Sequence, residues 1–343
     1  MNFKKISTEK DYCYIIGEAG LNHNGSLALA KELIEIAYNA GVDAVKFQKR
    51  QVDKLAVKNE LDKKDDRFPE FGKTYREIRN HLEFDKDQYL ELKKYSNNFG
   101  LDFIVTAFDI DSVDFLLDID LDVFKLASHS LTNLDLLEYL AKIKKPSILS
   151  TGMSNIEDID LAQNIFKRNN CELIILHCVS SYPTPPDQVN LKMLDLLQSR
   201  YSNIVGYSGH ELGYLPTLSA VSRGAKVIER HFTKDKEMIG FDHKISLEPN
   251  ELKNMVSQIR EIQKYLTFTE KKITDFEKIT SNKYHVSAVL NKNLNKGEIL
   301  KKNYIEFKNP GTGIPPKTIH KIIGKKAKDN IESDTILDFS MFL

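Results

Sequence analysis

Polar residues recur at the ends of short apolar runs along this sequence. Glu18 closes one run, Lys46 and Gln48 stand in another (VKFQ), and Glu229 and His231 stand in a third (ERHF). Side chains alternate between the two faces of a strand, so Lys46 shares a face with Gln48, and Glu229 with His231. One polar residue at such a position is usually an ordinary rim residue. Eight runs that all end in this way indicate that the polar faces meet at a reactive site.

Two histidines follow neighbouring runs, His210 after GYSG and His231 within ERHF. Adjacent strands lie about 4.8 Å apart, so both imidazoles could reach one metal ion. A structural role and a metal site with Glu229 nearby both remain open. Two imidazoles leave most of the coordination sphere to water and substrate, which suits a labile Mn²⁺ or Mg²⁺ better than a structural zinc. We expect no metal role for His23, His177, His243 and His285.

Lys46 and Lys125 are also expected to point into the site. A buried lysine is costly unless an anion meets it. One possibility is a Schiff-base aldolase, in which a desolvated lysine attacks a carbonyl group. The other is a phosphate or carboxylate clamp, in which ammonium groups and hydroxyls both donate to anion oxygens. The clamp is favoured because hydroxyls accompany the lysines, namely Thr106, Ser128, Ser150 and Ser208.

The elements that position these residues alternate between strands and helices. The sequence predicts strands at Tyr12–Gly17, Ala44–Gln48, Phe103–Phe108, Val123–Leu126, Ser147–Ser150, Leu173–Val179, Ile204–Tyr207 and Val227–Phe232. Amphipathic stretches such as Leu27–Asn39, Asp85–Phe99, Ile156–Lys167 and Pro249–Tyr265 separate them. Eight such units predict an α/β fold, a (β/α)8 TIM barrel with its chemistry at the carboxyl ends of the strands. A doubly wound sheet is the alternative, but no G-x-G-x-x-G turn follows the first strand.

The chain of 343 residues is expected to hold a catalytic barrel (1–266), a linker (267–283) and a small β-rich domain (284–343). Runs at His285–Leu290 and Thr335–Phe339 support the small domain, and little pattern is visible in the linker. The charged, poorly periodic segment 51–79 is long for a loop, which is typical of a functional segment.

Composition excludes several classes of protein. Lys plus Arg equals Asp plus Glu at 49 each, so no global field favours nucleic acid or a membrane surface. The three cysteines, Cys13, Cys171 and Cys178, have neither metal spacing nor an even number for disulfides. With no signal peptide or membrane span in the sequence, we expect a cytoplasmic protein with reduced thiols.

Several motifs in the expected order resemble one family, the sialic acid (nonulosonic acid) synthases. These motifs are GEAGLNHNGSLALAKELIEIAYNAGVDAVKFQ, ILSTGMS, LHCVSSYPTP, GYSGHELG, ERHFT and FDHKISLEP. The C-terminal VLNKNLNKGEIL and KNPGTGIPP resemble the antifreeze-like (SAF) domain of those enzymes. The resemblance covers nearly the whole chain and implies a TIM barrel followed by an antifreeze-like domain.

The resemblance implies a transferase of cell-surface polysaccharide biosynthesis. It would condense phosphoenolpyruvate with an N-acyl hexosamine, giving a nine-carbon 2-keto sugar acid and phosphate. N-acetylmannosamine, which would yield N-acetylneuraminate, is the expected acceptor. A 2,4-diacetamido-trideoxy sugar, giving legionaminic or pseudaminic acid, and mannose are alternatives. A lysine aldolase and a non-catalytic sugar-binding homologue are remoter ones.

The resemblance also implies roles for individual residues. A divalent ion, Mn²⁺ or else Mg²⁺ or Co²⁺, would bind to His210 and His231. The residues implied to hold phosphoenolpyruvate are Lys46, Thr106, Lys125, Ser128, Ser150, Ser180 and Ser208. Those implied to bind the sugar are Glu18, Gln48, Tyr182, Asp242 and Asn309, and those implied to be catalytic are Glu18, Lys46, Lys125, Glu229 and Asp242.

The family's members are homodimers in which the small domain of one subunit caps the barrel of the other. The resemblance therefore implies that the proline- and glycine-rich loop 309–316 lies over a partner's sugar site. Many bacterial members read K-R-P-G where this chain reads Lys308-Asn309-Pro310-Gly311. An asparagine is shorter than arginine and uncharged, so the difference bears on the choice of sugar rather than on the reaction.

Overall fold

The structure is a computed structural model, and it describes residues 1, 3–9, 12–267 and 270–343. It contains two compact units, Met1–Thr267 and Phe268–Leu343. Within the described residues, no helix is both long enough and apolar enough to cross a membrane.

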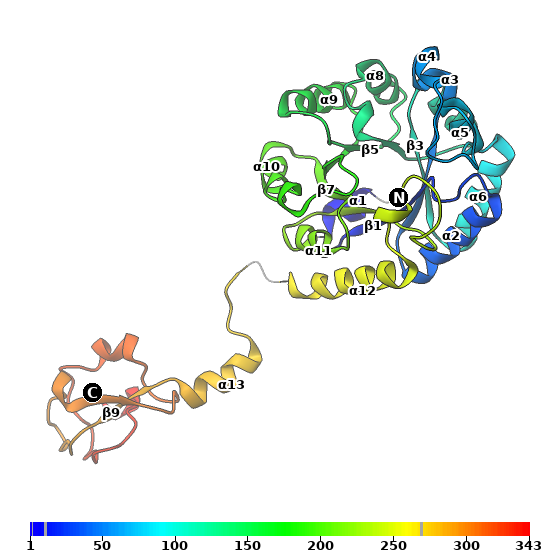
Figure 1. The fold of residues 1–343 in the computed structure, drawn as a ribbon. Coiled ribbons are helices and arrows are strands. Elements are labelled where there is room, and N and C mark those ends of the chain that lie inside the picture. The colour runs from blue at the N-terminus through cyan, green and yellow to red at the C-terminus, as the bar shows by residue number, and fades with distance from the viewer. Residues whose placement is uncertain (2, 10–11, 268–269) are drawn as a thin grey trace. The chain divides into compact units, whose positions relative to one another are not determined.

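The first unit is a closed barrel of eight parallel strands that neighbour one another in chain order (Figure 1). The strands are β1 (Tyr14–Gly20), β2 (Ala44–Lys49), β3 (Asp102–Ala107), β4 (Phe124–Leu126), β5 (Ser147–Ser150), β6 (Leu173–Cys178), β7 (Ile204–Gly209) and β8 (Val227–His231). The predicted barrel is therefore confirmed, and the open sheet is wrong. The first strand runs past its predicted end because all seven of its residues are buried, so Glu18 lies within the strand.

Helices surround the barrel and cover its outer face (Figure 1). The main ones are α2 (Leu27–Ala40), α6 (Lys86–Asn98), α7 (Ile110–Leu117), α8 (Leu134–Lys142), α9 (Ile156–Arg168), α10 (Lys192–Arg200), α11 (Leu215–Ser222) and α12 (Pro249–Tyr265). Their ends follow local chemistry. Ser26 caps the start of α2 by accepting from Leu29 N, and Gly41 ends it in the left-handed region at φ 81°.

The barrel interior changes from apolar to polar along each strand. In β2, Ala44 packs in the inner apolar cluster with α1 (Phe3–Thr8), while Lys46 and Gln48 follow on the same face. Val45 and Phe47 point the other way, into the cluster between sheet and helices. Because the side-chain period is two, each interior position lies one layer beyond the last. One end of the barrel is thus a packed core, and the other is a polar chamber.

The segment after β2 folds into short helices rather than a loop. These are α3 (Val52–Leu55), α4 (Lys58–Leu61) and α5 (Tyr75–His81). Phe68, Phe71 and Ile78 pack with Leu21 and Leu82 in a small cluster of their own. This packing fixes the segment beside the barrel and places α5 within reach of the polar chamber.

The second unit contains α13 (Asp275–Tyr284) and an antiparallel pair, β9 (Ser287–Leu290) with β10 (Ile305–Lys308). Its core includes Leu290, Leu300 and Leu337. Residues 268–269 of the expected linker lie outside the described residues. Helix α13 forms where the sequence predicts little structure, because Thr274 and Glu277 make a capping box at its start. The predicted run Thr335–Phe339 forms a single bridge, Val289 to Ile336, instead of a strand.

Candidate active site

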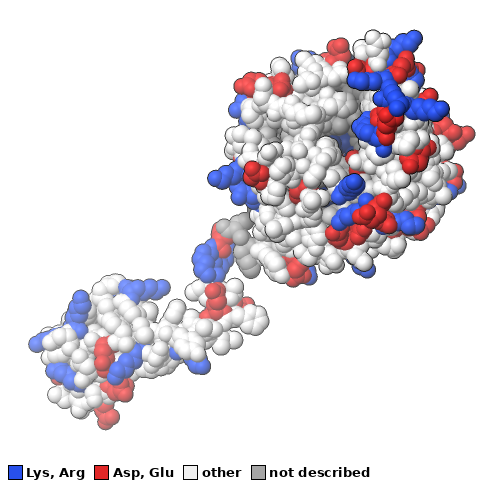
Figure 2. Space-filling view, in the orientation of Figure 1, with Lys and Arg blue, Asp and Glu red and all other residues white. Residues whose placement is uncertain are grey.

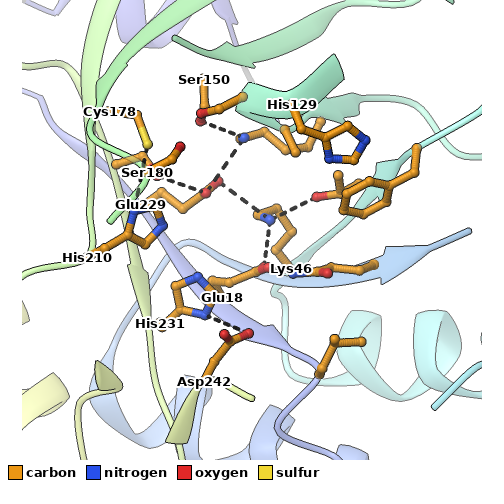
Figure 3. A pocket seen from close by; sticks show the side chains of 18 of the residues that line it. Glu18, Lys46, His129, Ser150, Cys178, Ser180, His210, Glu229, His231 and Asp242 are labelled. Carbon is orange, nitrogen blue, oxygen red and sulfur yellow. Dashed lines mark hydrogen bonds and ion pairs between the residues drawn. The ribbon is translucent and has the colours of Figure 1, made fainter. Parts of the chain in front are cut away.

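A cavity of about 290 Å³ opens among the carboxyl ends of the barrel strands (Figure 3). Its lining contains every residue that the sequence assigned to the site except Asn309. Those residues are Glu18, Lys46, Gln48, Thr106, Lys125, Ser128, Ser150, Ser180, Tyr182, Ser208, His210, Glu229, His231 and Asp242. The barrel therefore brings together side chains that are spread over more than two hundred positions of the chain.

Lys46 lies at the centre of this set. Its Nζ is 2.7 Å from Glu18 Oε2, 2.9 Å from Thr106 Oγ1 and 3.7 Å from Glu229 Oε2. The register explains the contacts, since Glu18 lies opposite Lys46, and Gln48 opposite Thr106. Gln48 Nε2 also donates to Glu18 Oε1 at 2.7 Å. The ammonium group of Lys46 is thus buried at 2% exposure but fully surrounded by acceptors.

Lys125 forms the second half of the network. Its Nζ donates to Ser150 Oγ at 2.7 Å and to Leu126 O at 3.0 Å, and it lies 3.7 Å from Glu229 Oε1. Ser208 donates to the same Glu229 oxygen at 3.2 Å. Glu229 therefore stands between the two lysines, and Figure 3 shows its carboxylate facing Lys46. Two ammonium groups and several hydroxyls converge on one small space, which is the donor set that an anion with many oxygens requires.

The two glutamates differ in their electrostatic surroundings. Burial raises the pKa of Glu18; Lys46 opposes the rise and Glu229 adds to it. Burial acts on Glu229 in the same direction, but Lys125 and Lys46 outweigh it and hold its pKa well below the usual range. Burial lowers the pKa of Lys125, and Glu229 offsets part of that change. Glu18 is therefore the carboxyl group better suited to carry a proton, while Glu229 stays ionised.

The two predicted metal-binding histidines lie together at the cavity wall, with ring centroids 5.4 Å apart. His210 Nδ1 donates to Val179 O at 2.9 Å, which leaves the lone pair of Nε2 free. His231 Nδ1 is buried without a hydrogen-bond partner and lies 3.8 Å from Asp242 Oδ2. Burial also lowers the pKa of His231 to about 4, so this imidazole is neutral, as a ligand must be.

These residues fit a divalent ion. Imidazole nitrogens bind metals at about 2.1 Å, so rings at this separation can share one ion. Among the described residues, no group of three or more His, Cys, Asp and Glu side chains could hold a metal by itself. A metal ion bound by two imidazoles keeps coordination positions free for water and substrate, which is what a catalytic ion requires.

Hydroxyl groups and one aromatic ring complete the wall. Ser128 Oγ accepts from Gly152 N at 3.0 Å, and a Cβ on Gly152 would lie 2.3 Å from Ser180 Oγ. The same Cβ would lie 2.9 Å from Ser128 Oγ, so a glycine at position 152 leaves room for both serine hydroxyls. The ring of Tyr182 lies 4.1 Å from that of His210, between centroids. Tyr182 thus places an aromatic ring beside one of the two predicted metal-binding histidines.

Several cavity residues escaped the sequence analysis. Arg50 and Arg79, with Phe108, His129 and Phe241, line the same cavity. Arg79 comes from α5, in a segment without periodicity, so no pattern aims it at the barrel mouth. Arg50 directly follows β2, and its place after VKFQK is the one signal that could have identified it.

The four histidines for which no metal role is expected, His23, His177, His243 and His285, do not line the cavity. His23 stacks on Phe84 with centroids 4.3 Å apart, and His177 Nε2 donates to Val189 O at 2.8 Å. Asn309 belongs to the second unit, where it is exposed and its Nδ2 lies 3.4 Å from Tyr284 O. Its implied contact with a partner's sugar site stays a prediction.

Comparison with known proteins gives consistent results across both units. Residues 33–271 match the NeuB family, and residues 285–343 match the SAF domain. The chain is 40% identical to N,N'-diacetyllegionaminic acid synthase of Campylobacter jejuni, over 94% of this chain and 98% of that protein. It is 36% identical to human N-acetylneuraminate-9-phosphate synthase, over 95% and 92% of the two chains. A crystal structure of N-acetylneuraminic acid (sialic acid) synthetase from Leptospira borgpetersenii, in complex with citrate, has a TM-score of 0.70 at 34% identity and covers 78% of this chain and 90% of that one.

Proposed function

The chain belongs to the NeuB family, and we propose that it condenses phosphoenolpyruvate with an N-acyl hexosamine. The products are a nine-carbon 2-keto sugar acid and inorganic phosphate. One observation carries the proposal: two buried lysines, Lys46 and Lys125, face one cavity together with the hydroxyls of Thr106 and Ser150. Phosphoenolpyruvate has a carboxylate and a phosphate close together, and such a dense set of donors matches both groups.

The reaction forms one carbon–carbon bond and one carbon–oxygen bond, the latter from water, and breaks the carbon–oxygen bond to phosphate. Carbon 3 of phosphoenolpyruvate attacks the aldehyde carbon of the open-chain sugar. A water molecule adds to carbon 2, and the tetrahedral intermediate releases phosphate to leave the keto group. In this scheme Lys46 and Lys125 hold the anionic groups, with Ser128, Ser180 and Ser208 as further donors. Negative charge that develops during the reaction stays in contact with these fixed donors.

The two glutamates handle protons and charge. Glu18, whose pKa is raised, supplies the proton that the new alkoxide of the sugar requires. Glu229 remains ionised between the lysines and fixes their positions. When phosphoenolpyruvate binds, protonation of Glu18 leaves Lys46 free to serve the substrate as its counterion.

A divalent ion, Mn²⁺ for preference, fits between His210 and His231. When bound there it would polarise the aldehyde oxygen and make the aldehyde carbon more electrophilic. Asp242 lies next to His231 and can orient it or the sugar. Gln48 and Tyr182 are the further groups assigned to sugar recognition.

N-acetylmannosamine is the proposed acceptor skeleton, and a 2,4-diacetamido sugar is the alternative. The relatives at 40% and 36% identity are named for legionaminic acid and for N-acetylneuraminate 9-phosphate, so both skeletons occur at similar distance. The test measures the release of phosphate from phosphoenolpyruvate in the presence of Mn²⁺. Four acceptors are compared, namely N-acetylmannosamine, its 6-phosphate, the 2,4-diacetamido sugar and mannose. Release with at least one acceptor supports the proposal, and silence across the panel refutes it.

We also propose a homodimer in which the SAF domain of one subunit covers the cavity of the other. The second unit has its own core, yet the apolar side chains of α13 remain exposed, with Phe276 at 86% and Ile279 at 73%. Sedimentation of the full chain tests the dimer.

The three cysteines are free thiols, which fits a reducing cytoplasm.

A further inference from the structure

We propose that Arg50 and Arg79 form a second anion subsite in the cavity. It would bind a phosphate ester at the end of the acceptor sugar that is remote from the aldehyde. The inference rests on the proposed function, because it concerns the acceptor of that reaction. It goes beyond that function in assigning a charge to the acceptor and two residues to its recognition.

Arg79 is an arginine without a counterion. Its Nε is buried and has no hydrogen-bond partner, and its guanidinium makes no ion pair with any residue that the structure describes. The group is held by two rings instead, since its Cζ lies 4.3 Å from the Phe241 centroid and 5.0 Å from that of Tyr75. Stacking fixes the plane of a guanidinium and leaves its N–H edges available to a ligand.

Arg50 is the second cation, and its charge is only partly balanced. It is 4% exposed, and it donates to Gln48 Oε1 at 2.5 Å and to Glu83 Oε1 at 3.5 Å. The same Glu83 also accepts from Lys49 at 2.9 Å, so one carboxylate serves two cations. The Arg50 Cζ stacks 4.2 Å from the Phe108 centroid. Burial and then the nearby Arg79 lower the pKa of Arg50, which is consistent with two guanidinium groups close to each other.

The charges divide the cavity into two zones. Lys46 and Lys125 are matched by Glu18 and Glu229, so the zone inside the barrel is balanced. On the side of α5, Arg50 shares the carboxylate of Glu83 with Lys49, and Arg79 pairs with no carboxylate of the described residues, which leaves an excess of positive charge there. Figure 2 shows Lys and Arg side chains interspersed with Asp and Glu side chains on the outer surface over the α3–α5 side of the barrel. A phosphate monoester carries between one and two negative charges at neutral pH and matches this excess; a neutral sugar does not.

The position of the pair fits the far end of an acceptor. The aldehyde carbon must meet phosphoenolpyruvate near Lys46 and Lys125, inside the barrel. The other end of the sugar must then extend away from the strands, and α5 lies outside the barrel wall. Arg79 enters the cavity from there. Guanidinium forks bind phosphate oxygens in pairs, which suits this terminal group.

A purely structural role for Arg79 has to be separated from binding. It could join α5 to the loop after β8 through Phe241. Arg67 supplies a matched control, because its Cζ stacks on the same two rings, 5.2 Å from Phe241 and 6.0 Å from Tyr75. Arg67 differs in being paired with Asp65 at 2.6 Å and in not lining the cavity.

The experiment compares wild type, Arg79→Gln and Arg67→Gln in the full chain with Mn²⁺ and saturating phosphoenolpyruvate. Phosphate release is measured with N-acetylmannosamine and with its 6-phosphate. Wild type should prefer the 6-phosphate in kcat/KM by at least about tenfold. Arg79→Gln should lower kcat/KM for the 6-phosphate roughly 10- to 100-fold, the scale of lost hydrogen bonds to a charged group. Its values for N-acetylmannosamine and its KM for phosphoenolpyruvate should stay within about twofold, and Arg67→Gln should match wild type.

If Arg79→Gln lowers kcat/KM equally for both acceptors, Arg79 only joins α5 to the loop after β8, and the inference is overturned. A wild-type enzyme that uses N-acetylmannosamine as well as its 6-phosphate would also overturn it. If no acceptor yields phosphate, the proposed function fails, and calorimetry then decides on the subsite. Binding of N-acetylmannosamine 6-phosphate to wild type and Arg67→Gln, weakened at least about tenfold in Arg79→Gln, would support it. No binding to wild type would overturn it.

Discussion

Replacement of Lys125 by methionine tests the anion clamp most sharply. The ammonium group donates to Ser150 Oγ at 2.7 Å and lies 3.7 Å from Glu229 Oε1. Methionine keeps an unbranched chain of similar length, so Lys125→Met removes the charge with little change in packing. In the proposed function the same charge holds an anionic group of phosphoenolpyruvate.

The size of the effect follows from the distances. Two unit charges about 4 Å apart interact by about 4 kcal/mol at an effective dielectric constant near 20. An equal loss of transition-state binding corresponds to roughly a thousandfold fall in kcat/KM for phosphoenolpyruvate. The unliganded protein also loses one of the two cations that face Glu229, and stripping a partner from a buried ion pair costs about 3–5 kcal/mol. Because Lys46 still faces Glu229, we expect a loss of stability below that range, about 2 kcal/mol.

The assay combines phosphate release at varied phosphoenolpyruvate with urea unfolding. The double variant Lys125→Met/Glu229→Gln should recover most of the stability, because it removes one buried cation and one buried anion together. It should recover none of the activity, because the Lys125 ammonium group is still missing. Lys142→Met serves as the control, since Lys142 forms only an exposed pair with Glu138 at 3.6 Å. A Lys125→Met enzyme that keeps kcat/KM within about tenfold of wild type would refute the clamp.

Three further predictions follow from the same geometry. Borohydride added with pyruvate should trap no adduct on Lys46 or Lys125, whereas a stable adduct on either would favour the aldolase. His231→Ala should lose bound Mn²⁺, measured by mass spectrometry of the purified protein, together with phosphate release, and His177→Gln should keep both. Burial lowers the pKa of His23 to about 3 from its usual 6.5, so the unfolded chain binds a proton there in a window where the folded protein does not. Stability should therefore fall as pH decreases through that window, and His23→Gln should remove up to about 1.4 kcal/mol per pH unit from the slope seen in urea unfolding; an unchanged slope would contradict the burial argument.

The barrel was accessible from the sequence because its signal is repeated. Each strand is a short apolar run, and the polar residues near the carboxyl ends of the strands line one cavity in the structure. Lys46 and Glu229 illustrate this, since period-two alternation alone aims both into the chamber. Neighbouring strands then convert positions far apart in the chain into contacts, as in the pairing of Ser208 with Glu229.

The other features of the fold and the site could not be predicted, because they depend on packing that produces no periodic pattern in the sequence. Arg79 reaches the cavity because Phe68, Phe71 and Ile78 anchor its segment on the barrel. Helix α13 was missed for the opposite reason, since its apolar side chains bury nothing within the described structure and its pattern therefore carries little information. The pKa values of Glu18 and Glu229 diverge through distances to two lysines that only the folded barrel fixes.

The central claim is that carbon 3 of phosphoenolpyruvate becomes bonded to the sugar. Incubation of the full chain with phosphoenolpyruvate labelled with ¹³C at carbon 3, Mn²⁺ and the acceptor panel, followed by NMR, observes that bond directly. We expect the label to appear as the methylene group of a new sugar acid, formed in equal amount to the phosphate released. A label found only in the methyl group of pyruvate, or only in unreacted phosphoenolpyruvate across the whole panel, would contradict the claim.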